Sequence, residues 1–172
     1  MHVLIGSQTD AHTAARAFCL ETIKEFYDFD YRQDWHEDLD SLCLEEANNH
    51  YAPANRGGFW YLTGGDDKIV ATVGIRALHW KPAIVRAFRD RYRNPGTVCS
   101  LWRLYVRQDL RGRGLGRSLN ALAENEAVRL GYDTMYLHAS SDAGATISFW
   151  KAMGYADIGE YDFSTHFDKR LG

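Results

Sequence analysis

The chain has 172 residues and a formal net charge of -3, and 45% of its residues are hydrophobic. This length predicts one domain over residues 1–172 with a core that needs neither disulfides nor a metal, and the charge gives no basic surplus for nucleic acid as a main partner. Because it has no start typical of a secretion signal, no run of about eighteen apolar residues, and no paired spacing among Cys19, Cys43 and Cys99, we expect a cytoplasmic protein without membrane contact, disulfide or zinc site.

The spacing of apolar residues predicts the elements of the first half of the chain. They are, in order, a strand at 3–5, a helix at 8–26, a loop at 28–40, a weaker helix built on Leu39, Leu42, Cys43 and Ala47 that ends before Pro53, and a hairpin of strands 58–63 and 69–75. The hairpin is supported by the turn sequence Gly-Gly-Asp-Asp between its strands.

The second half is predicted to alternate strands with helices. The expected elements are a short basic helix at 82–92, a strand at 98–106, an amphipathic helix at 114–130, a strand at 134–139, a helix at 143–153 and strands at 155–158 and 166–171. This order predicts an α/β domain with a mixed sheet.

A glycine-rich basic loop joins the strand that ends at Val106 to the helix that follows. Gly112, Gly114 and Gly116 let the backbone approach a ligand closely, and the first N–H groups of the helix face outward, where an anion can accept them. Three arginines of this loop, at positions 111, 113 and 117, add positive charge. The loop therefore predicts a site for a phosphorylated cofactor.

The spacing of the glycines excludes two common phosphate loops. A nucleoside triphosphate loop requires Gly-Lys-Ser/Thr after four intervening residues, but here the segment ends Gly116-Arg117-Ser118. A dinucleotide fingerprint requires Gly-x-Gly-x-x-Gly, which fails whether it is counted from Gly112 or from Gly114. The pattern that remains is Arg-x-x-Gly-x-Gly, from Arg111 to Gly116.

This pattern, with the Leu-Tyr-Val strand before it, resembles the coenzyme A loop of the GNAT superfamily of N-acyltransferases. The helix at 114–130 fits the same family, and residues 149–155 are similar to its Phe-Tyr-x-x-x-Gly-Phe motif. The likeness covers about the C-terminal half of the chain. It implies a mixed, mostly antiparallel central sheet that is splayed into a V between the strands ending at Val106 and Ala139, with helices on both faces.

The resemblance also implies the reaction and its cofactor site. Acetyl-CoA would be the co-substrate, with its pyrophosphate on the amides of 112–117, its pantetheine along the backbone of 104–106, and its thioester carbonyl polarised by a backbone N–H of that strand. The acetyl group would pass directly to a primary amine of a small molecule. The residues assigned to the cofactor are Leu104, Tyr105, Val106, Arg111, Gly112, Arg113, Gly114, Leu115, Gly116 and Arg117.

Two positions depart from the pattern of the family. Trp150 stands where many relatives carry a tyrosine that protonates the leaving thiolate, and Ser100 stands where histone-type members carry a glutamate base. These departures leave a second hypothesis open, an acyl-CoA-binding module without activity. A third hypothesis is an unrelated nucleotide-binding protein, which ATP or NAD would stabilise against heat.

His138 is the candidate catalytic residue, because it lies near the end of the strand that would form one wall of the cleft. A histidine in a strand can equally be a packed core residue. His36 and Glu37 are the other candidate bases, in a charged stretch that is also typical of a solvated loop.

Two stretches bear on the acceptor. The acids and aromatics of residues 25–40 form either an acidic, aromatic mouth for a cationic amine or an ordinary surface whose aromatics pack inward. The basic segment 80–93 is either a solvated helix face or a place that holds an acidic group of the coenzyme or the acceptor. The oligomeric state is not determined by these patterns, and a homodimer is the assembly to test.

Overall fold

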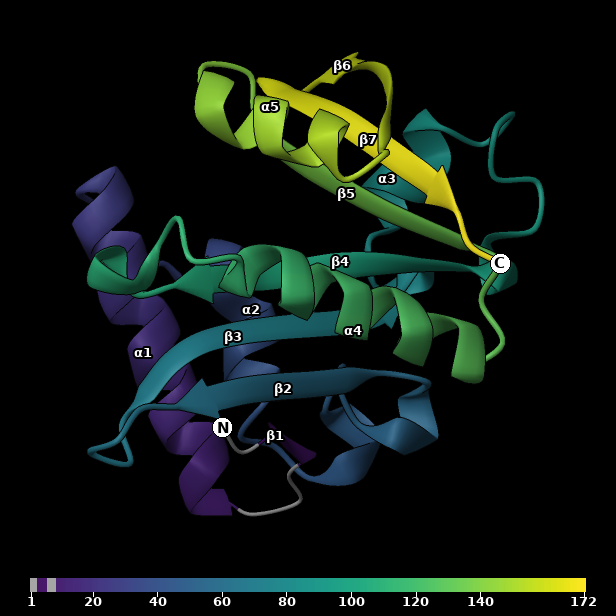
Figure 1. Ribbon diagram of the computed structural model, residues 1–172. Coiled ribbons are helices and arrows are strands. Elements are labelled where there is room, and N and C mark those ends of the chain that lie inside the picture. Colours follow the sequence, from purple (N-terminus) through teal and green to yellow (C-terminus); the bar gives the residue numbers. More distant parts are fainter. Residues whose placement is uncertain (1–2, 6–8) are drawn as a thin grey trace.

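The computed structural model describes residues 3–5 and 9–172, and its centre is a seven-stranded sheet in the order β1-β2-β3-β4-β5-β7-β6 (Figure 1). Neighbouring strands pair antiparallel except for β4 and β5, which are parallel. The strands are β1 (Val3–Ile5), β2 (Gly58–Thr63), β3 (Ile69–Ala77), β4 (Val98–Val106), β5 (Thr134–Ser140), β6 (Ala156–Tyr161) and β7 (Ser164–Arg170). This is the mixed, mostly antiparallel sheet that the family resemblance implies.

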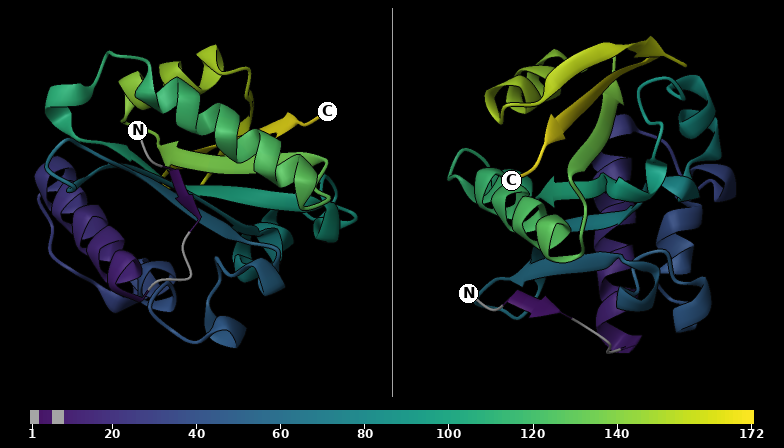
Figure 2. Two further views of the ribbon diagram at one scale, coloured as in Figure 1. Left: turned by 60° about the horizontal axis from the view of Figure 1, so that its bottom comes forward. Right: turned by 90° about the vertical axis from the view of Figure 1, so that its right-hand side faces the viewer.

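Helices cover both faces of the sheet. They are α1 (Thr9–Tyr27), α2 (Gln33–Ser41), α3 (Pro82–Ala87), α4 (Leu115–Arg129) and α5 (Gly144–Ala152). Figure 2 shows α4 and α5 on one face and α1 and α2 on the other. Helix α4 turns an apolar stripe of Leu119, Ala123 and Ala127 to the sheet. In the part of the chain that the structure describes, no helix is both long and apolar enough to cross a membrane.

Most of the predicted elements are confirmed. The hairpin, the strand at 98–106 and the helix after the glycine loop lie where the pattern places them, with boundaries that differ by a residue or two. The predicted basic helix from residue 82 ends early, at Ala87, and a helix is present over 144–152. Residue 8, the predicted start of the first helix, lies outside the described residues.

The prediction of a loop at 28–40 followed by a helix at 39–47 is wrong. The second helix, α2, covers Gln33–Ser41, and residues 46–48 form only a single 3₁₀ turn. The buried face of α2 contains His36, Asp38 and Ser41 as well as Leu39, so polar groups occupy positions where a pattern search expects apolar ones.

The sheet splits between β4 and β5. These strands pair only at Val98–Ser100 with Thr134–Tyr136, and then diverge. Among the described residues, the rest of β4 pairs only with β3, while β5 pairs with β7 from end to end. Figure 1 shows the two strands meeting at one end and opening toward the other, with α4 in front of the lower arm. The facing edges of the two strands are therefore unpaired in the opening.

A β-bulge lies inside this opening. Thr72 pairs with Tyr105 and Gly74 with Trp102, so two residues of β4 lie opposite the single residue Val73 of β3. One of the two, Arg103, has a φ of 50°, in the left-handed region that non-glycine residues rarely adopt. The bulge therefore stores strain at the wall of the opening.

Candidate functional site

The glycine loop presents free backbone donors. Gly114 is the N-cap of α4 with a φ of 83°, and Gly112 has a φ of 74°. Within residues 9–172, no protein atom accepts a hydrogen bond from the N–H groups of 112–117; the N–H of Ser118, which donates to the carbonyl of Gly114 at 3.0 Å, is the first to be paired. The residues from 111 to 114 are exposed. These donors, together with the helix dipole, form a site that suits an anion.

The arginines of the loop are not equivalent. Arg111 Nε donates to the carbonyl oxygen of Val106 at 2.9 Å, and its guanidinium lies 3.9 Å from the ring centroid of Phe26. Its side chain therefore joins the end of β4 to α1. Arg113 and Arg117 are exposed and form no ion pair with the described residues, so their charges are available beside the free amides.

The split in the sheet contains a cleft of about 660 Å³. Its walls are Leu101–Tyr105 of β4 and Leu137–Ser140 of β5, and its other lining comes from α1, α2, α5 and the turn between β6 and β7. The loop adjoins this cleft, because a Cβ added at Gly116 would lie 3.7 Å from Leu104 Cδ2. Anion donors and an unpaired strand edge thus occur together.

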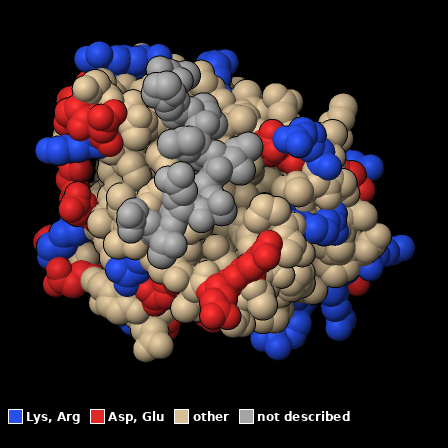
Figure 3. Space-filling view, turned by 90° about the horizontal axis from the view of Figure 1, so that it is seen from below, with Lys and Arg blue, Asp and Glu red and all other residues tan. Residues whose placement is uncertain are grey.

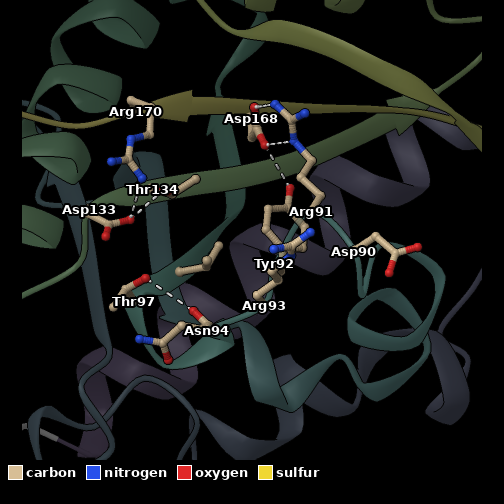
Figure 4. Close-up of a pocket in the computed structure, with 11 residues that line it drawn as sticks. Asp90, Arg91, Tyr92, Arg93, Asn94, Thr97, Asp133, Thr134, Asp168 and Arg170 are labelled. Carbon is tan, nitrogen blue, oxygen red and sulfur yellow. Dashed lines mark hydrogen bonds and ion pairs between the residues drawn. The ribbon is translucent and has the colours of Figure 1, made fainter.

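A second hollow, of about 530 Å³, lies at the closed end of the split, where β4 and β5 are paired (Figure 4). Several of its polar side chains are paired with one another. Arg91 Nε lies 2.5 Å from an Asp168 oxygen, Tyr92 donates to the same carboxylate at 3.1 Å, and Thr134 donates to Asp133 at 2.6 Å. The contacts of Arg91 and Tyr92 with Asp168 tie the loop after α3 to β7.

The comparison with known families decides what this arrangement is. The model of the Acetyltransferase (GNAT) family matches residues 20–155. The chain belongs to the GNAT acetyltransferase family. A search of curated proteins finds no match to the sequence.

Solved GNAT structures share the fold of this chain. A GNAT-family acetyltransferase from Staphylococcus aureus Mu50 is 15% identical over 99% of both chains, with a TM-score of 0.75. An acetyltransferase from Streptococcus agalactiae 2603 is 16% identical over 99% of this chain and 98% of its own, with a TM-score of 0.70. The PaiA N-acetyltransferase from Thermoplasma acidophilum, solved in complex with coenzyme A, is 14% identical over 99% of this chain and 100% of its own, with a TM-score of 0.68.

His138 lines the cleft of this GNAT domain. Its ring stacks on His166 at 5.7 Å and meets Trp102 edge-on at 5.8 Å, and its Nδ1 lies 3.5 Å from Lys81 Nζ. Burial, and then repulsion by the Lys81 ammonium, lower the pKa of His138 well below its usual value. The imidazole is therefore neutral near pH 7, with a lone pair on one ring nitrogen, and is a weaker base than a free imidazole.

The other candidate bases are placed differently. His36 is buried and lines the cleft, but its Nδ1 accepts the N–H of Arg32 at 2.8 Å. Burial lowers the pKa of His36, so the ring is neutral and its proton lies on Nε2, which makes it a donor toward the cleft. Glu37 is exposed and does not line the cleft.

Ser100 and Trp150, the two departures from the family pattern, are held in the packing. The hydroxyl of Ser100 is buried, accepts from Trp102 Nε1 at 2.8 Å and donates to the carbonyl of Arg76 at 3.2 Å. Trp150 lines the cleft, and its ring meets Phe149 edge-on at 4.9 Å. Neither side chain can act as a general acid or a general base near neutral pH. The proton donor and acceptor that the family pattern supplies at these two positions are therefore absent.

Only half of the expected acceptor mouth lies at the cleft. Tyr27, Phe29 and Trp35 line it, but none of the acids of residues 25–40 does. The aspartates among them pair with basic residues: Asp28 and Asp30 with Lys24, Asp34 with Arg32, Asp38 with Arg103, and Asp40 with Arg16. The part of the mouth that residues 25–40 contribute is therefore aromatic rather than acidic.

The sequence analysis missed the buried charges behind the cleft. Arg103 Nε donates to Asp38 Oδ2 at 2.9 Å, and Tyr51 donates to the same oxygen at 2.6 Å. Burial alone would raise the pKa of Asp38, but the Arg103 guanidinium outweighs it and lowers this pKa to about 2. Arg76 and Lys81 lie nearby. No local pattern marks these residues, because they come from different elements.

Proposed function

We propose that this GNAT domain transfers the acetyl group of acetyl-CoA directly to a primary amine of a small molecule. One observation carries the proposal: the unpaired N–H groups of residues 112–117 adjoin a strand edge that is also unpaired. A diphosphate would accept from the amides at the start of α4, where the helix dipole favours negative charge and Arg113 and Arg117 add their own.

The open edge of β4 suits the amide-containing arm of the co-substrate. Beyond Ser100 this edge has no strand partner, so backbone donors and acceptors near Leu104, Tyr105 and Val106 are available to pair as a neighbouring strand would. Recognition by backbone also explains why the side chains here are ordinary strand residues. The pairing would bring the thioester to the bulge at Arg103.

The reaction needs one proton acceptor and no covalent enzyme intermediate. The amine nitrogen attacks the thioester carbonyl carbon, a backbone N–H of β4 stabilises the oxyanion, and the C–S bond breaks to release the thiolate. The amine proton passes to His138, directly or through a water molecule. Because a thiolate is a stable leaving group near neutral pH, the reaction can proceed although Trp150 replaces the usual acid.

A binding module without turnover is the second candidate, favoured by Trp150 and by the locked hydroxyl of Ser100. The two functions differ in thiol release. The protein should be mixed with acetyl-CoA and a panel of primary amines, with thiol measured by absorbance and the acetylated amine by mass. We expect release that depends on the amine. Tight coenzyme A binding without release across the panel would support the module, and absence of coenzyme A binding would refute both.

A further inference from the structure

Arg76 and Lys81 do not line the cleft themselves but lie against its Trp102 wall, where the described residues include more cations than anions. The Trp102 ring, which lines the cleft, lies 3.8 Å from the Arg76 guanidinium, 4.3 Å from Lys81 Nζ and 5.4 Å from the Arg103 guanidinium. Asp38 is the buried carboxylate beside them, and it is engaged by Arg103 and by the hydroxyl of Tyr51. Among the described residues, the other two cations, Arg76 and Lys81, form no ion pair.

Arg76 is the first of these two cations. The residue is 5% exposed, and among the described residues its side chain forms no ion pair and its Nε has no hydrogen-bond partner. Its Nη1 lies 2.7 Å from Nδ1 of His50, and burial followed by repulsion from Arg76 lowers the pKa of His50, so this partner is neutral. A buried charge that lacks a counterion is costly, and an anion supplied by a ligand would offset that cost.

Lys81 is the other. It directly precedes α3, its Nζ contacts His138 Nδ1 at 3.5 Å, and no carboxylate lies within ion-pair distance of it in the part of the chain that is described. Burial, and then repulsion by Arg76, lower the pKa of Lys81 to about 7. The other charged or titratable groups that face it are Asp38, Arg103, His138, His166 and Asp162.

Resting on the proposed function, we infer that the acceptor carries a carboxylate beside its reactive amine, and that Lys81, backed by Arg76, holds this carboxylate at the Trp102 wall of the cleft. A carboxylate offsets the excess of buried positive charge, whereas a polycation such as a polyamine increases it. Arg103 takes no part, because Asp38 already neutralises it.

The same placement couples recognition to proton transfer. Lys81 is the ammonium whose repulsion contributes most to the lowered pKa of His138. A carboxylate bound to Lys81 would screen that repulsion and draw the ammonium away from Nδ1. The acceptor would then find a stronger base next to its own amine.

Matched acceptors test this inference. Because Tyr27, Phe29, Trp35 and Phe163 give the cleft an aromatic rim, the first set is phenylalanine, phenylalanine amide and 2-phenylethylamine. The second set is methionine with its amide and its decarboxylated amine, and spermidine represents the polycations. We expect kcat/KM for the carboxylate-bearing member to exceed that of its partners by about tenfold or more.

Variants of Lys81 test whether this residue causes the preference for a carboxylate-bearing acceptor. Lys81→Met should remove the preference for the carboxylate, and Lys81→Arg should retain it, while both bind coenzyme A as the wild type does. Arg86→Met is the matched control, since Arg86 is an exposed cation on α3, the short helix that directly follows Lys81. Coenzyme A affinity shows that each variant is folded.

The pH dependence gives an independent readout. Because the pKa of Lys81 is about 7, the lysine loses its charge above that pH, and KM for the carboxylate-bearing acceptor should rise. Lys81→Arg keeps its charge, so its KM should stay level. Comparing the two proteins with the same acceptor cancels the titration of the acceptor's own amine.

The outcomes separate the inference from the proposed function. Equal or better turnover of the amides, the decarboxylated amines or spermidine would overturn the inference and leave the acetyltransferase intact. An unchanged preference in Lys81→Met would do the same. If no amine of any kind releases thiol, the proposed function fails, and the inference fails with it.

Discussion

Asp38 and Arg103 form a buried ion pair that joins α2 to the β-bulge of β4, between residues 65 positions apart in the chain. The pair accompanies the left-handed backbone of Arg103, whose φ is 50°. Such a conformation persists only where surrounding contacts hold it. The ion pair therefore shapes the wall of the cleft as well as the core.

Asp38→Asn should destabilise the fold strongly. The amide keeps the shape of the side chain but leaves the Arg103 guanidinium buried without a counterion, a change that costs about 3–5 kcal/mol. Urea unfolding measures the free energy. Asp40→Asn is the control, because the Asp40–Arg16 pair is about one-third exposed and is worth about 1 kcal/mol or less. Similar losses in both variants would contradict a special role for the buried pair.

The same pair predicts a loss of stability in acid. The pKa of Asp38 is about 2 in the fold and near its ordinary value of 3.8 when unfolded. A lowered folded-state pKa contributes stability that is present above the unfolded value and is lost as pH falls from about 4 toward 2. The free energy of unfolding, measured across this window, should fall more steeply in the wild type than in Asp38→Asn. If the two proteins gave parallel curves of unfolding free energy against pH, the lowered pKa of Asp38 would be contradicted.

Gly114→Val should weaken coenzyme A binding about tenfold to a hundredfold and leave the fold intact. A Cβ at this position meets open space, but a φ of 83° strains any branched residue, so the loop must shift its free amides. Gly65→Val, in the open turn of the β2–β3 hairpin, is the control. Calorimetry gives both affinities. An unchanged affinity in Gly114→Val would remove the loop from the cofactor site.

His138→Gln should lower kcat by about 10²–10⁴ without changing coenzyme A affinity, because the base is lost while the loop and strand edge remain. His79→Gln, at an exposed histidine just before Lys81, should act as the wild type does. Steady-state kinetics with the best acceptor of the panel measures both. Wild-type kcat in His138→Gln would assign the proton to another group.

Ser100→Ala should affect stability rather than the pH profile. Removing the hydroxyl leaves the part-buried Trp102 Nε1 without its acceptor, which costs about 1–3 kcal/mol. Ser148→Ala, exposed on α5, should change stability by less than about 0.5 kcal/mol. Since Ser100 is not the base, kcat/KM should keep its dependence on pH. A shifted midpoint in the pH profile of kcat/KM would mean that Ser100 takes part in proton transfer.

Part of this site could be predicted from contiguous residues. The strand, glycine loop and helix from Leu104 to Leu130 were predicted because backbone conformation and helical periodicity are local properties. Helix α2 was missed because its inward side carries Asp38 and His36, which look solvated until their partners are known. The aromatic rim was anticipated, but the pairing of the neighbouring acids with Lys24, Arg32, Arg16 and Arg103 was not.

The sequence alone determined the family resemblance, the order of the elements and the glycine loop that suits an anion, since each depends on residues close together in the chain. Only the tertiary structure decided where β4 and β5 separate and which buried charges lack a partner. Arg76, Lys81, Asp38 and Arg103 come from four segments, and the electrostatic balance of a site depends on distances between them that no local pattern contains.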